Sequence, residues 1–440
     1  MGINFHSILW RAHFIERGTQ MSKKAIFLPS LLLMISFILS ACIGLLPLEE
    51  EPVAGDFGPK TSLQEQQAKT FEALWKNLED NYIYFETADV DWKTLHDKYL
   101  EQINAGLTAE EFDNLIQDLA AELPAGSLAY ETRAERIEAD TVDTSSYEGI
   151  GAFVGFSKDP EPHIILLAVM DGSPAEQAGL KAHDSILEID GTPVQLDEGI
   201  TAVNRVRGPA GSSVTLSIQS PGSSERSIDV KRGKLTSTGK LEASLIKGTN
   251  YGYLLFPPVG YSTLLDDVTK SLQTFSTNRI LEGVILDLRI TGSTRGWPLE
   301  DLYNMFYHGA LGEFYNRDKK QSVELKGQDV FNSQKVPLII LVGQNTTGFP
   351  EILAGSLQMH KRATVIGETT PGAIETSSTY YLPDGSEAFI ETTSFVLPNG
   401  DEIGTTGVVP DIALQQGWDE VLPNNDPVLD RAVQYLDEQQ

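Results

Sequence analysis

The chain contains very little cysteine and histidine, and far fewer basic than acidic residues. Its single cysteine cannot form an internal disulfide, so a disulfide scaffold is excluded. The histidines lack the spacing of metal ligands, which excludes a structural zinc site. They are His6, His13, His96, His163, His183, His308 and His360. We expect neither a metal nor a cofactor.

The charge balance excludes another class of partner. The chain has 33 Lys and Arg against 62 Asp and Glu, a net charge of −29. So acidic a chain repels phosphate backbones, and no basic stretch offsets this, so nucleic acid is not expected as a partner. The 440 residues are 41% hydrophobic and 22% charged, as in globular proteins, and predict two or three domains.

An uncharged apolar segment occupies residues 25–46. It follows Lys23 and Lys24, which gives the basic and then apolar regions of an export signal. Cys42 follows the residues LSA near the end of this segment, an arrangement that resembles the lipobox of bacterial lipoproteins. The resemblance implies that residues 1–42 are a lipoprotein signal peptide with a diacylated Cys42. The mature protein would then be extracytoplasmic and lipid-anchored in the cell membrane of a bacterial envelope.

An uncleaved transmembrane anchor is the alternative for this segment, because it is long enough to span a bilayer. Pro29 and several serines weaken a spanning helix, which favours the signal peptide. Both interpretations put everything after Cys42 outside the cytoplasm. Met21 is a second candidate start, because MSKK followed by the apolar run is a complete signal by itself.

Residues 43–62 carry Glu, Pro and Gly without periodicity and are typical of a tether. Residues 63–135 are predicted to form a small helical domain, because apolar side chains recur there at helical spacing. The first apolar stripe consists of Phe71, Leu74, Trp75, Leu78 and Tyr82. Thr108 and Glu111 form a capping box for a further helix. The aromatic residues of this domain are more typical of a core than of a ligand site.

From residue 147 to residue 234 the pattern changes to short strands. GIGAFVGF at 149–156 is followed by the apolar run HIILLAVM at 163–170. Ser173 as N-cap, Pro174 in the first turn and Gly179 at the stop predict a short helix. Asp190 and Gly191 predict a hairpin turn between two further strands.

Residues 240–418 alternate buried strands with helices, which predicts a layered α/β core. The strands are GYLLF, GVILDLR, PLIILV and ATVIGE, and the helical stretches lie near 263–278, 298–307 and 350–361. Residues 419–440 end the chain with an amphipathic helix that begins at Asp426 and Pro427.

This order of segments resembles the tail-specific proteases, also called C-terminal processing peptidases, over about residues 65 to 440. The motifs are GIGAFVGF, GSPAEQAGLKAHDSILEIDGTPV, LDLR at 286–289, PEILAGSLQ at 350–358, KRATVIGETTPG at 361–372 and GVVPDI at 407–412. The resemblance implies a multi-domain α/β protein. It would have an N-terminal helical domain, a PDZ-like β-rich domain and a ClpP/crotonase-like α/β core.

The PDZ resemblance implies a peptide-binding strand. The glycine-rich turn Gly149, Ile150 and Gly151 would aim its amides at a C-terminal carboxylate, and Ala152 and Phe153 would begin the strand that pairs with the peptide. The alternative is that these glycines only permit a tight bend.

The resemblance also predicts where a Ser–Lys dyad would stand. Family members carry the serine in a loop that reads S-A-S-A-S-E-I, three residues before the glutamate, and the lysine follows T-F-G. Glu351 aligns the first loop and puts Gly348 at the serine position. The segment GETTPG at 367–372 puts Ala373 at the lysine position, at the family's interval of 373 − 348 = 25 residues. Because neither residue can attack or accept a proton, we predict no catalytic residues and no peptidase activity.

Further departures agree with this prediction. The asparagine-rich, paired-glycine turn that follows LDLR in the family is replaced by residues 290–294, ITGST, and the polar residue four positions after the lysine corresponds to Ser377. Thr346, Thr347 and Ser356 (beside Lys361) are the candidates for a substitute nucleophile. Loop threonines usually satisfy turns, however, and Lys361 is expected on a solvated face. His360 is nearby but has no evident carboxylate partner.

We therefore expect a non-catalytic protein whose PDZ-like domain binds unstructured or C-terminal peptides of envelope proteins. It would present these peptides to an active protease or withhold them from it. The competing hypothesis is an active serine-type endopeptidase that cleaves C-terminal regions of envelope proteins with a relocated nucleophile. A third hypothesis is a structural envelope protein with a closed PDZ groove.

Overall fold

The computed structural model describes residues 61–124, 126–136, 147–235, 239–277, 279–293, 296–404, 406–422 and 425–440. The predicted signal segment, Cys42 and all but the last two residues of the predicted tether lie outside this part. Within it, every helix is too short or too polar to cross a bilayer.

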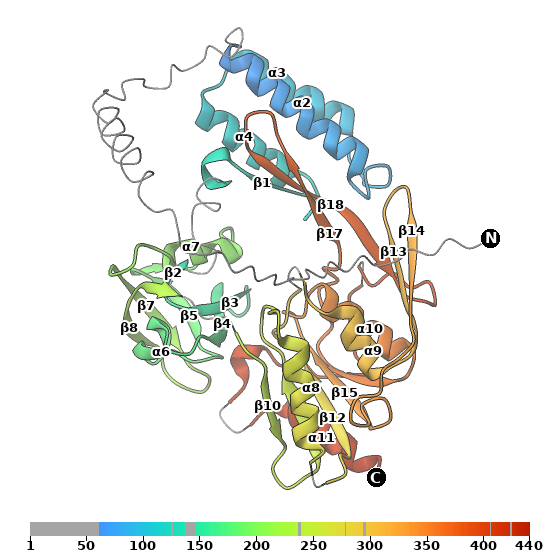
Figure 1. The fold of residues 1–440 in the computed structure, drawn as a ribbon. Helices are drawn as coiled ribbons and strands as arrows, with labels where there is room; N and C mark the ends of the chain where they lie inside the picture. The colour runs from blue at the N-terminus through green and yellow to red at the C-terminus, as the bar shows by residue number, and fades with distance from the viewer. Residues whose placement is uncertain are drawn as a thin grey trace, which may run out of the picture. The chain divides into compact units, whose positions relative to one another are not determined.

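The first described segment is helical, as the sequence predicts (Figure 1). Its helices are α2 (Leu63–Asn81), α3 (Trp92–Ala105) and α4 (Ala109–Glu122). The hydroxyl of Thr108 accepts a hydrogen bond from the Glu111 amide, and the Glu111 carboxylate accepts one from the Thr108 amide, so the predicted capping box is present. The predicted stripe on α2 is buried and packs against α3 and α4.

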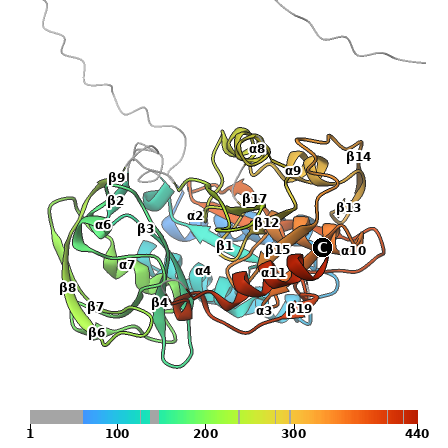
Figure 2. The same cartoon turned by 90° about the horizontal axis from the view of Figure 1, so that it is seen from below.

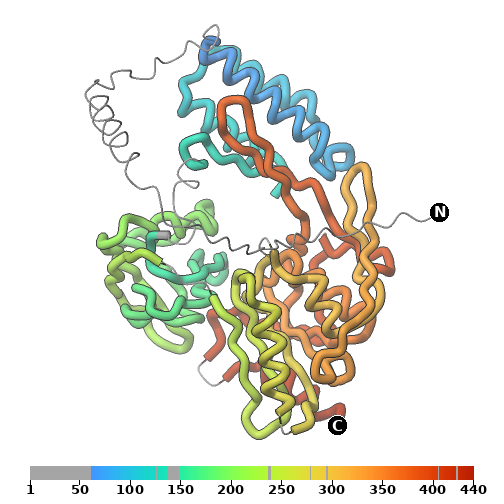
Figure 3. The backbone as a smooth tube through the Cα atoms, viewed as in Figure 1, coloured from blue at the N-terminus to red at the C-terminus, as the bar shows by residue number. Residues whose placement is uncertain are grey.

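This helical domain shares its core with a distant strand. Strand β1 (Leu128–Glu131) pairs antiparallel with β18 (Glu387–Val396), about 260 residues later in the chain. Figure 3 shows these two strands side by side beneath the helices. The sheet is completed by β13 (Gly309–Tyr315), β14 (Lys320–Leu325) and β17 (Thr376–Tyr381). No local pattern in the sequence indicated these pairings.

The β-rich domain is built around one antiparallel sheet. Its strands, in spatial order, are β3 (Ala152–Ser157), β4 (His163–Val169), β5 (Ser185–Ile189), β7 (Ser213–Gln219) and β8 (Arg226–Lys231), with β6 (Thr192–Pro193) beside β5. β2 (Tyr147–Gly149) pairs with β9 (Gly233–Leu235). The helices are α6 (Pro174–Ala178), η2 (Gly199–Ala202) and α7 (Val203–Val206). Asp190 and Gly191 both have positive φ (50° and 74°), as the predicted hairpin turn requires.

The α/β core contains a mostly parallel sheet. Its strands, in order, are β10 (Glu242–Leu245), β11 (Tyr251–Leu255), β12 (Gly283–Asp287), β15 (Leu338–Val342), β16 (Ala363–Gly367) and β19 (Ile412–Ala413), and only β10 is antiparallel. One face packs against α8 (Leu264–Phe275), α9 (Leu299–Phe306) and α10 (Phe349–Met359). The other face packs against α11 (Pro427–Glu438) (Figure 2). With helices on both faces, the central strands are buried runs without alternation, which explains their sequences.

Candidate functional site

Gly348 stands where the chain turns from β15 into α10. It is the N-cap residue of this helix, with φ 71° and ψ −128°. This is a backbone conformation that glycine adopts far more readily than other residues. The next residue but one, Pro350, begins the helix favourably because an amide is not needed in its first turn.

Ala373 lies close to Gly348 in space, although α10, β16 and the loops that follow them separate the two residues in sequence. A Cβ atom built on Gly348 would lie 3.7 Å from the carbonyl oxygen of Ala373. The side chain of Ala373 is exposed, whereas Gly348 is buried. The two positions that the resemblance assigns to a dyad are therefore neighbours, and neither carries a group able to transfer a proton.

A buried carboxylate joins the two loops. The Glu351 side chain is fully buried, and its Oε2 accepts a hydrogen bond from the Gly348 amide at 2.9 Å. Its Oε1 accepts one from the Gly372 amide at 2.6 Å. Burial raises the pKa of Glu351, and hydrogen bonds from Thr370 and the loop amides offset only part of that effect. Sequence reasoning used Glu351 only to align the loop and missed this positioning role.

The candidate substitute nucleophiles have structural partners. The Thr346 hydroxyl is buried, donates to the Leu288 carbonyl at 2.8 Å and accepts from the Gly343 amide at 2.9 Å. The Ser356 hydroxyl is also buried and donates to the Leu311 carbonyl at 2.8 Å. Both hydroxyls thus satisfy buried backbone groups.

The remaining groups near these hydroxyls do not form a dyad either. Thr347 uses its amide and carbonyl to pair with the turn after β12. A ring nitrogen of His360 lies 2.7 Å from the Ala310 carbonyl, and Lys361 is exposed, as predicted. Among the described residues, no amine or imidazole is hydrogen-bonded to Thr346, Thr347 or Ser356.

The predicted peptide-binding turn lies at the start of β3. The Ile150 carbonyl accepts a hydrogen bond from the Ala175 amide at 2.7 Å, and the Gly151 carbonyl accepts one from the Met170 amide at 3.0 Å. Gly151 has φ 83°, and a Cβ there would lie 2.4 Å from the Ser173 Cβ, so this position requires glycine. The turn is therefore held against the start of α6.

Strand β3 is an edge strand, because within the described sheet it pairs only with β4. Ala152 and Val154 pack against the core of the β-rich domain, whereas Phe153 faces the α/β core. A Cβ on Gly155 would lie 2.6 Å from the Asn345 side chain, so this strand passes close to the loop that leads to Gly348. An unpaired strand edge can accept an extended peptide.

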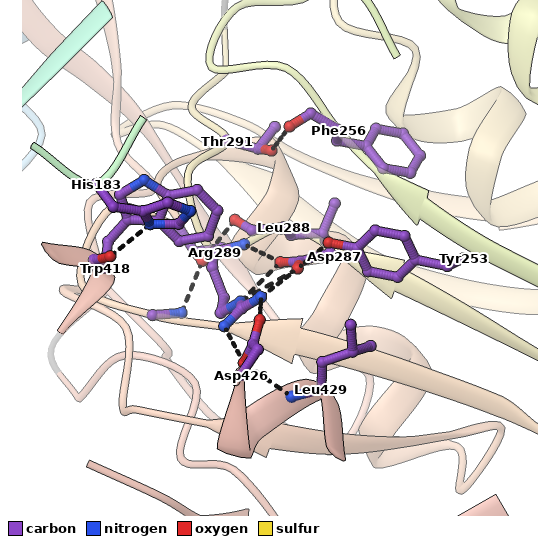
Figure 4. Close-up of polar contacts among 12 residues, drawn as sticks. His183, Tyr253, Phe256, Asp287, Leu288, Arg289, Thr291, Trp418, Asp426 and Leu429 are labelled. Atoms are coloured by element: carbon purple, nitrogen blue, oxygen red, sulfur yellow. Dashed lines mark hydrogen bonds and ion pairs between the residues drawn. The ribbon is translucent and has the colours of Figure 1, made fainter. Parts of the chain in front are cut away.

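Two histidines of the β-rich domain contact a short segment of the α/β core. The His183 ring lies 4.2 Å from the Trp418 ring, centre to centre, and its Nδ1 lies 2.6 Å from the Trp418 carbonyl (Figure 4). The Trp418 indole donates to the Leu167 carbonyl at 3.2 Å. His163 Nε2 lies 2.8 Å from Asp419 Oδ2. These contacts dock the β-rich domain on the core.

The docking groups have shifted pKa values. Burial lowers the pKa of His183, because it disfavours the charged imidazole. Burial acts in the same direction on His163, but the hydrogen bonds to Asp419 and to the Glu161 carbonyl outweigh it and raise the pKa. Burial would raise the pKa of Asp419, but the hydrogen bond and charge of His163 lower it. When His163 is protonated, it therefore forms an ion pair with Asp419 that a hydrogen bond reinforces.

The arginine of LDLR connects this docking segment to the sheet and to α11. Arg289 is buried and pairs with Asp287 and Asp426, each at 2.6 Å (Figure 4). Its guanidinium lies 5.1 Å from the centre of the Trp418 ring. Asp426 also caps α11 by accepting from the Leu429 amide at 3.0 Å. The Asp-x-Arg spacing was the only sequence signal for this network.

Two cavities lie along the contact between the β-rich domain and the core. One, of about 510 Å³, is lined by His183, Lys240 and Arg289 among others. The second, of about 1010 Å³, lies at the carboxyl ends of β15 and β16 and is lined by Asn345 and Glu368 among others. Neither cavity is lined by Gly348 or Ala373. Among the described residues, no cluster of His, Cys, Asp and Glu is arranged to hold a metal ion.

Comparison with known proteins identifies the family. Residues 250–414 match the model of peptidase family S41, residues 165–220 match a PDZ domain, and residues 64–121 match the Tricorn protease C1 domain. The chain belongs to the tail-specific protease family. A member from Synechocystis, a carboxyl-terminal-processing protease, is 27% identical over 363 residues, which cover 80% of this chain and 82% of that protein.

Other C-terminal processing proteases are also similar to this chain in sequence or in fold. Carboxy-terminal processing protease CtpB of Bacillus subtilis is 30% identical over 287 residues, which cover 63% of this chain and 57% of CtpB. The solved structure of a photosystem II D1 C-terminal processing protease superposes with a TM-score of 0.62 at 23% identity and covers 83% of this chain and 95% of that one. These comparisons confirm the predicted family and fold class: N-terminal helices, a PDZ domain and a peptidase α/β core.

Proposed function

We propose that this tail-specific protease family member is a lipid-anchored, extracytoplasmic peptide-binding protein without peptidase activity. The observation that carries the proposal is the juxtaposition of Gly348 and Ala373 at the two positions that the family uses for its nucleophile and its base. Loss of the nucleophile in a serine protease lowers turnover by roughly a millionfold, so a glycine at the nucleophile position is sufficient to abolish peptidase activity.

The supporting architecture of the site is retained although the reacting groups are missing. Glu351 still ties the Gly348 loop to the Gly372 loop, and the helix that follows is regularly formed. The PDZ domain keeps its glycine turn and its edge strand beside the Asn345 loop. Retention of the binding strand beside a site without a dyad supports capture of peptides rather than cleavage.

A cleavage assay tests the absence of activity. Purified full-length protein is incubated with unstructured peptides and, separately, with a serine-reactive probe, and we expect neither products nor labelling. If cleavage occurs, the variants Thr346→Val, Thr347→Val and Ser356→Ala show which hydroxyl, if any of the three, is the nucleophile. Loss of cleavage in one folded variant would establish the competing hypothesis, a peptidase with a relocated nucleophile.

Titration calorimetry tests the binding role. Peptides with an apolar C-terminal residue are titrated as the free acid and as the C-terminal amide, and we expect heat only from the free acid. This carboxylate dependence follows from the amides of the glycine turn. Equal heats would contradict recognition of the C-terminus, and no heat from either peptide would support a structural envelope protein with a closed groove.

The anchor has its own test. Cells that express the chain are fed a radiolabelled fatty acid, and we expect label in the protein and none in the Cys42→Ser variant. Label that survives this substitution, or its absence from the unmodified chain, would contradict lipidation. We further propose that the captured peptides come from envelope proteins and that an active protease is the partner to which they are presented or from which they are withheld.

A further inference from the structure

We infer that Ser293 fills the space in which the nucleophilic side chain of a tail-specific protease would stand. The reactive centre of this chain would then lack both the nucleophile and the space for one. The inference rests on the proposed function, because it takes Gly348 as the nucleophile position. A Cβ built on Gly348 would lie 2.1 Å from the Ser293 Oγ and 2.9 Å from the Ser293 Cβ. Both distances are far below the separation of non-bonded heavy atoms, about 3.5–4.0 Å.

Rotation of the Ser293 side chain cannot clear this space. A change of its one side-chain torsion moves the hydroxyl away, but the Cβ stays where the backbone holds it, still 2.9 Å from the added atom. Any side chain at position 348 therefore requires the backbone of the turn after β12 to move.

Hydrogen bonds hold that turn in place. The Ser293 amide donates to the Thr347 carbonyl at 3.1 Å, and the Thr347 amide donates to the Thr291 carbonyl at 3.1 Å. Gly292 and Thr347 form a parallel bridge, and the Gly292 amide donates to the Pro258 carbonyl at 3.0 Å. The turn is thus paired directly with the loop that carries Gly348.

The start of the same turn is anchored from the inside. The Thr291 side chain is fully buried, and its hydroxyl donates to the Phe256 carbonyl at 3.1 Å (Figure 4). Because the amides of Gly292 and Ser293 already donate to carbonyls, they are not available to stabilise an oxyanion. The contacts of this turn therefore close both the nucleophile position and the neighbouring donor positions.

Ser293 has no partner that would make it a nucleophile itself. Among the described residues, no amine or imidazole is hydrogen-bonded to its hydroxyl, and the dyad-equivalent residue beside it, Gly348, has no side chain. An unassisted serine hydroxyl is a weak nucleophile. Ser293 is consequently a space-filling residue that excludes a substrate carbonyl from the Gly348 loop.

Thiol accessibility tests this inference, because Cys42 is the single cysteine of the chain. In the full chain with Cys42→Ser, we introduce Gly348→Cys, Gly348→Cys together with Ser293→Gly, and Ala373→Cys as an exposed control. We expect iodoacetamide to alkylate the Gly348→Cys variant about tenfold more slowly than either of the others, because overpacking holds the thiol in a closed space. Equal rates for Gly348→Cys with and without Ser293→Gly would overturn the inference.

A double-mutant cycle measured by thermal unfolding provides a second test in case the Gly348→Cys variant does not fold. Gly348→Ala adds only the Cβ, and the unfavourable φ is the same in both backgrounds. We expect Gly348→Ala to lower Tm clearly less in the Ser293→Gly background than in the unmodified chain, and additive shifts would refute the contact. Peptide cleavage by the unmodified chain would contradict only the proposed absence of peptidase activity. The alkylation rates and Tm shifts test only whether Ser293 fills the space at position 348, so the two claims can fail separately.

Discussion

Replacement of Arg289 by methionine removes the cation that holds two carboxylates, Asp287 and Asp426. The methionine keeps most of the apolar stem, so the loss is chiefly electrostatic. The Asp287 side chain is fully buried, whereas 18% of the Asp426 side chain is exposed. Removal of one partner of a buried ion pair lowers the free energy of unfolding by about 3–5 kcal/mol.

The lower end of that range applies here, because each carboxylate keeps other donors. Asp287 retains the Tyr253 hydroxyl at 2.8 Å and a backbone amide at 3.1 Å, and Asp426 retains the amide of Leu429. We therefore expect Arg289→Met to lower the free energy of unfolding by about 3 kcal/mol in urea titrations near neutral pH. Asp426 adds a pH dependence. Burial would raise the pKa of Asp426, but the hydrogen bond and charge of Arg289 outweigh burial and lower it. The part of the stability loss that comes from the Asp426–Arg289 pair therefore disappears as the pH falls below the usual aspartate range.

Arg431→Met is the matched control. Arg431 lies on α11 and its ion pair with Glu438 is long, 3.6 Å, and partly exposed, so a loss of about 0–1 kcal/mol is expected. If Arg289→Met were no more destabilising than Arg431→Met, the argument that Arg289 compensates buried charge would be wrong.

Three further predictions concern buried and half-buried carboxylates. Glu351→Gln leaves one oxygen for two loop amides, so we expect a loss of about 1–3 kcal/mol in urea unfolding, and an unchanged midpoint would contradict the positioning role. Asp419→Asn breaks the ion pair with His163. The pKa of His163 is raised and that of Asp419 is lowered, so the loss of stability should be larger at about pH 6 than at about pH 9, and the reverse order would refute the pairing. Burial, with a smaller effect of the Glu375 charge, raises the pKa of Glu391 to about 7. The folded protein therefore loses stability as the pH rises from the usual glutamate pKa of 4.5, and the loss is complete above about pH 7. Glu391→Gln should stabilise the protein by about 1 kcal/mol at about pH 8, after allowance for partial exposure, and leave it unchanged at about pH 4.

Local features of the fold were predictable from the sequence because their causes lie within a few residues. The capping box of Thr108 and Glu111 and the hairpin turn at Asp190 involve groups three residues apart or fewer. The buried strands of the core were recognisable from their unbroken apolar runs. The pairing of β1 with β18 was not, because nothing near residue 128 specifies a partner near residue 390.

The sequence by itself determined that position 348 carries no hydroxyl and position 373 no amine, since no fold can supply these groups to a glycine and an alanine. It also determined the family, through motifs in a fixed order. Only the tertiary structure decided that these two positions are neighbours, that Glu351 holds their loops together and that Ser293 occupies the space into which a side chain at position 348 would point. Such contacts depend on the path of the backbone between loops 25 to 80 residues apart, and that path is set by the packing of the whole core rather than by any local pattern.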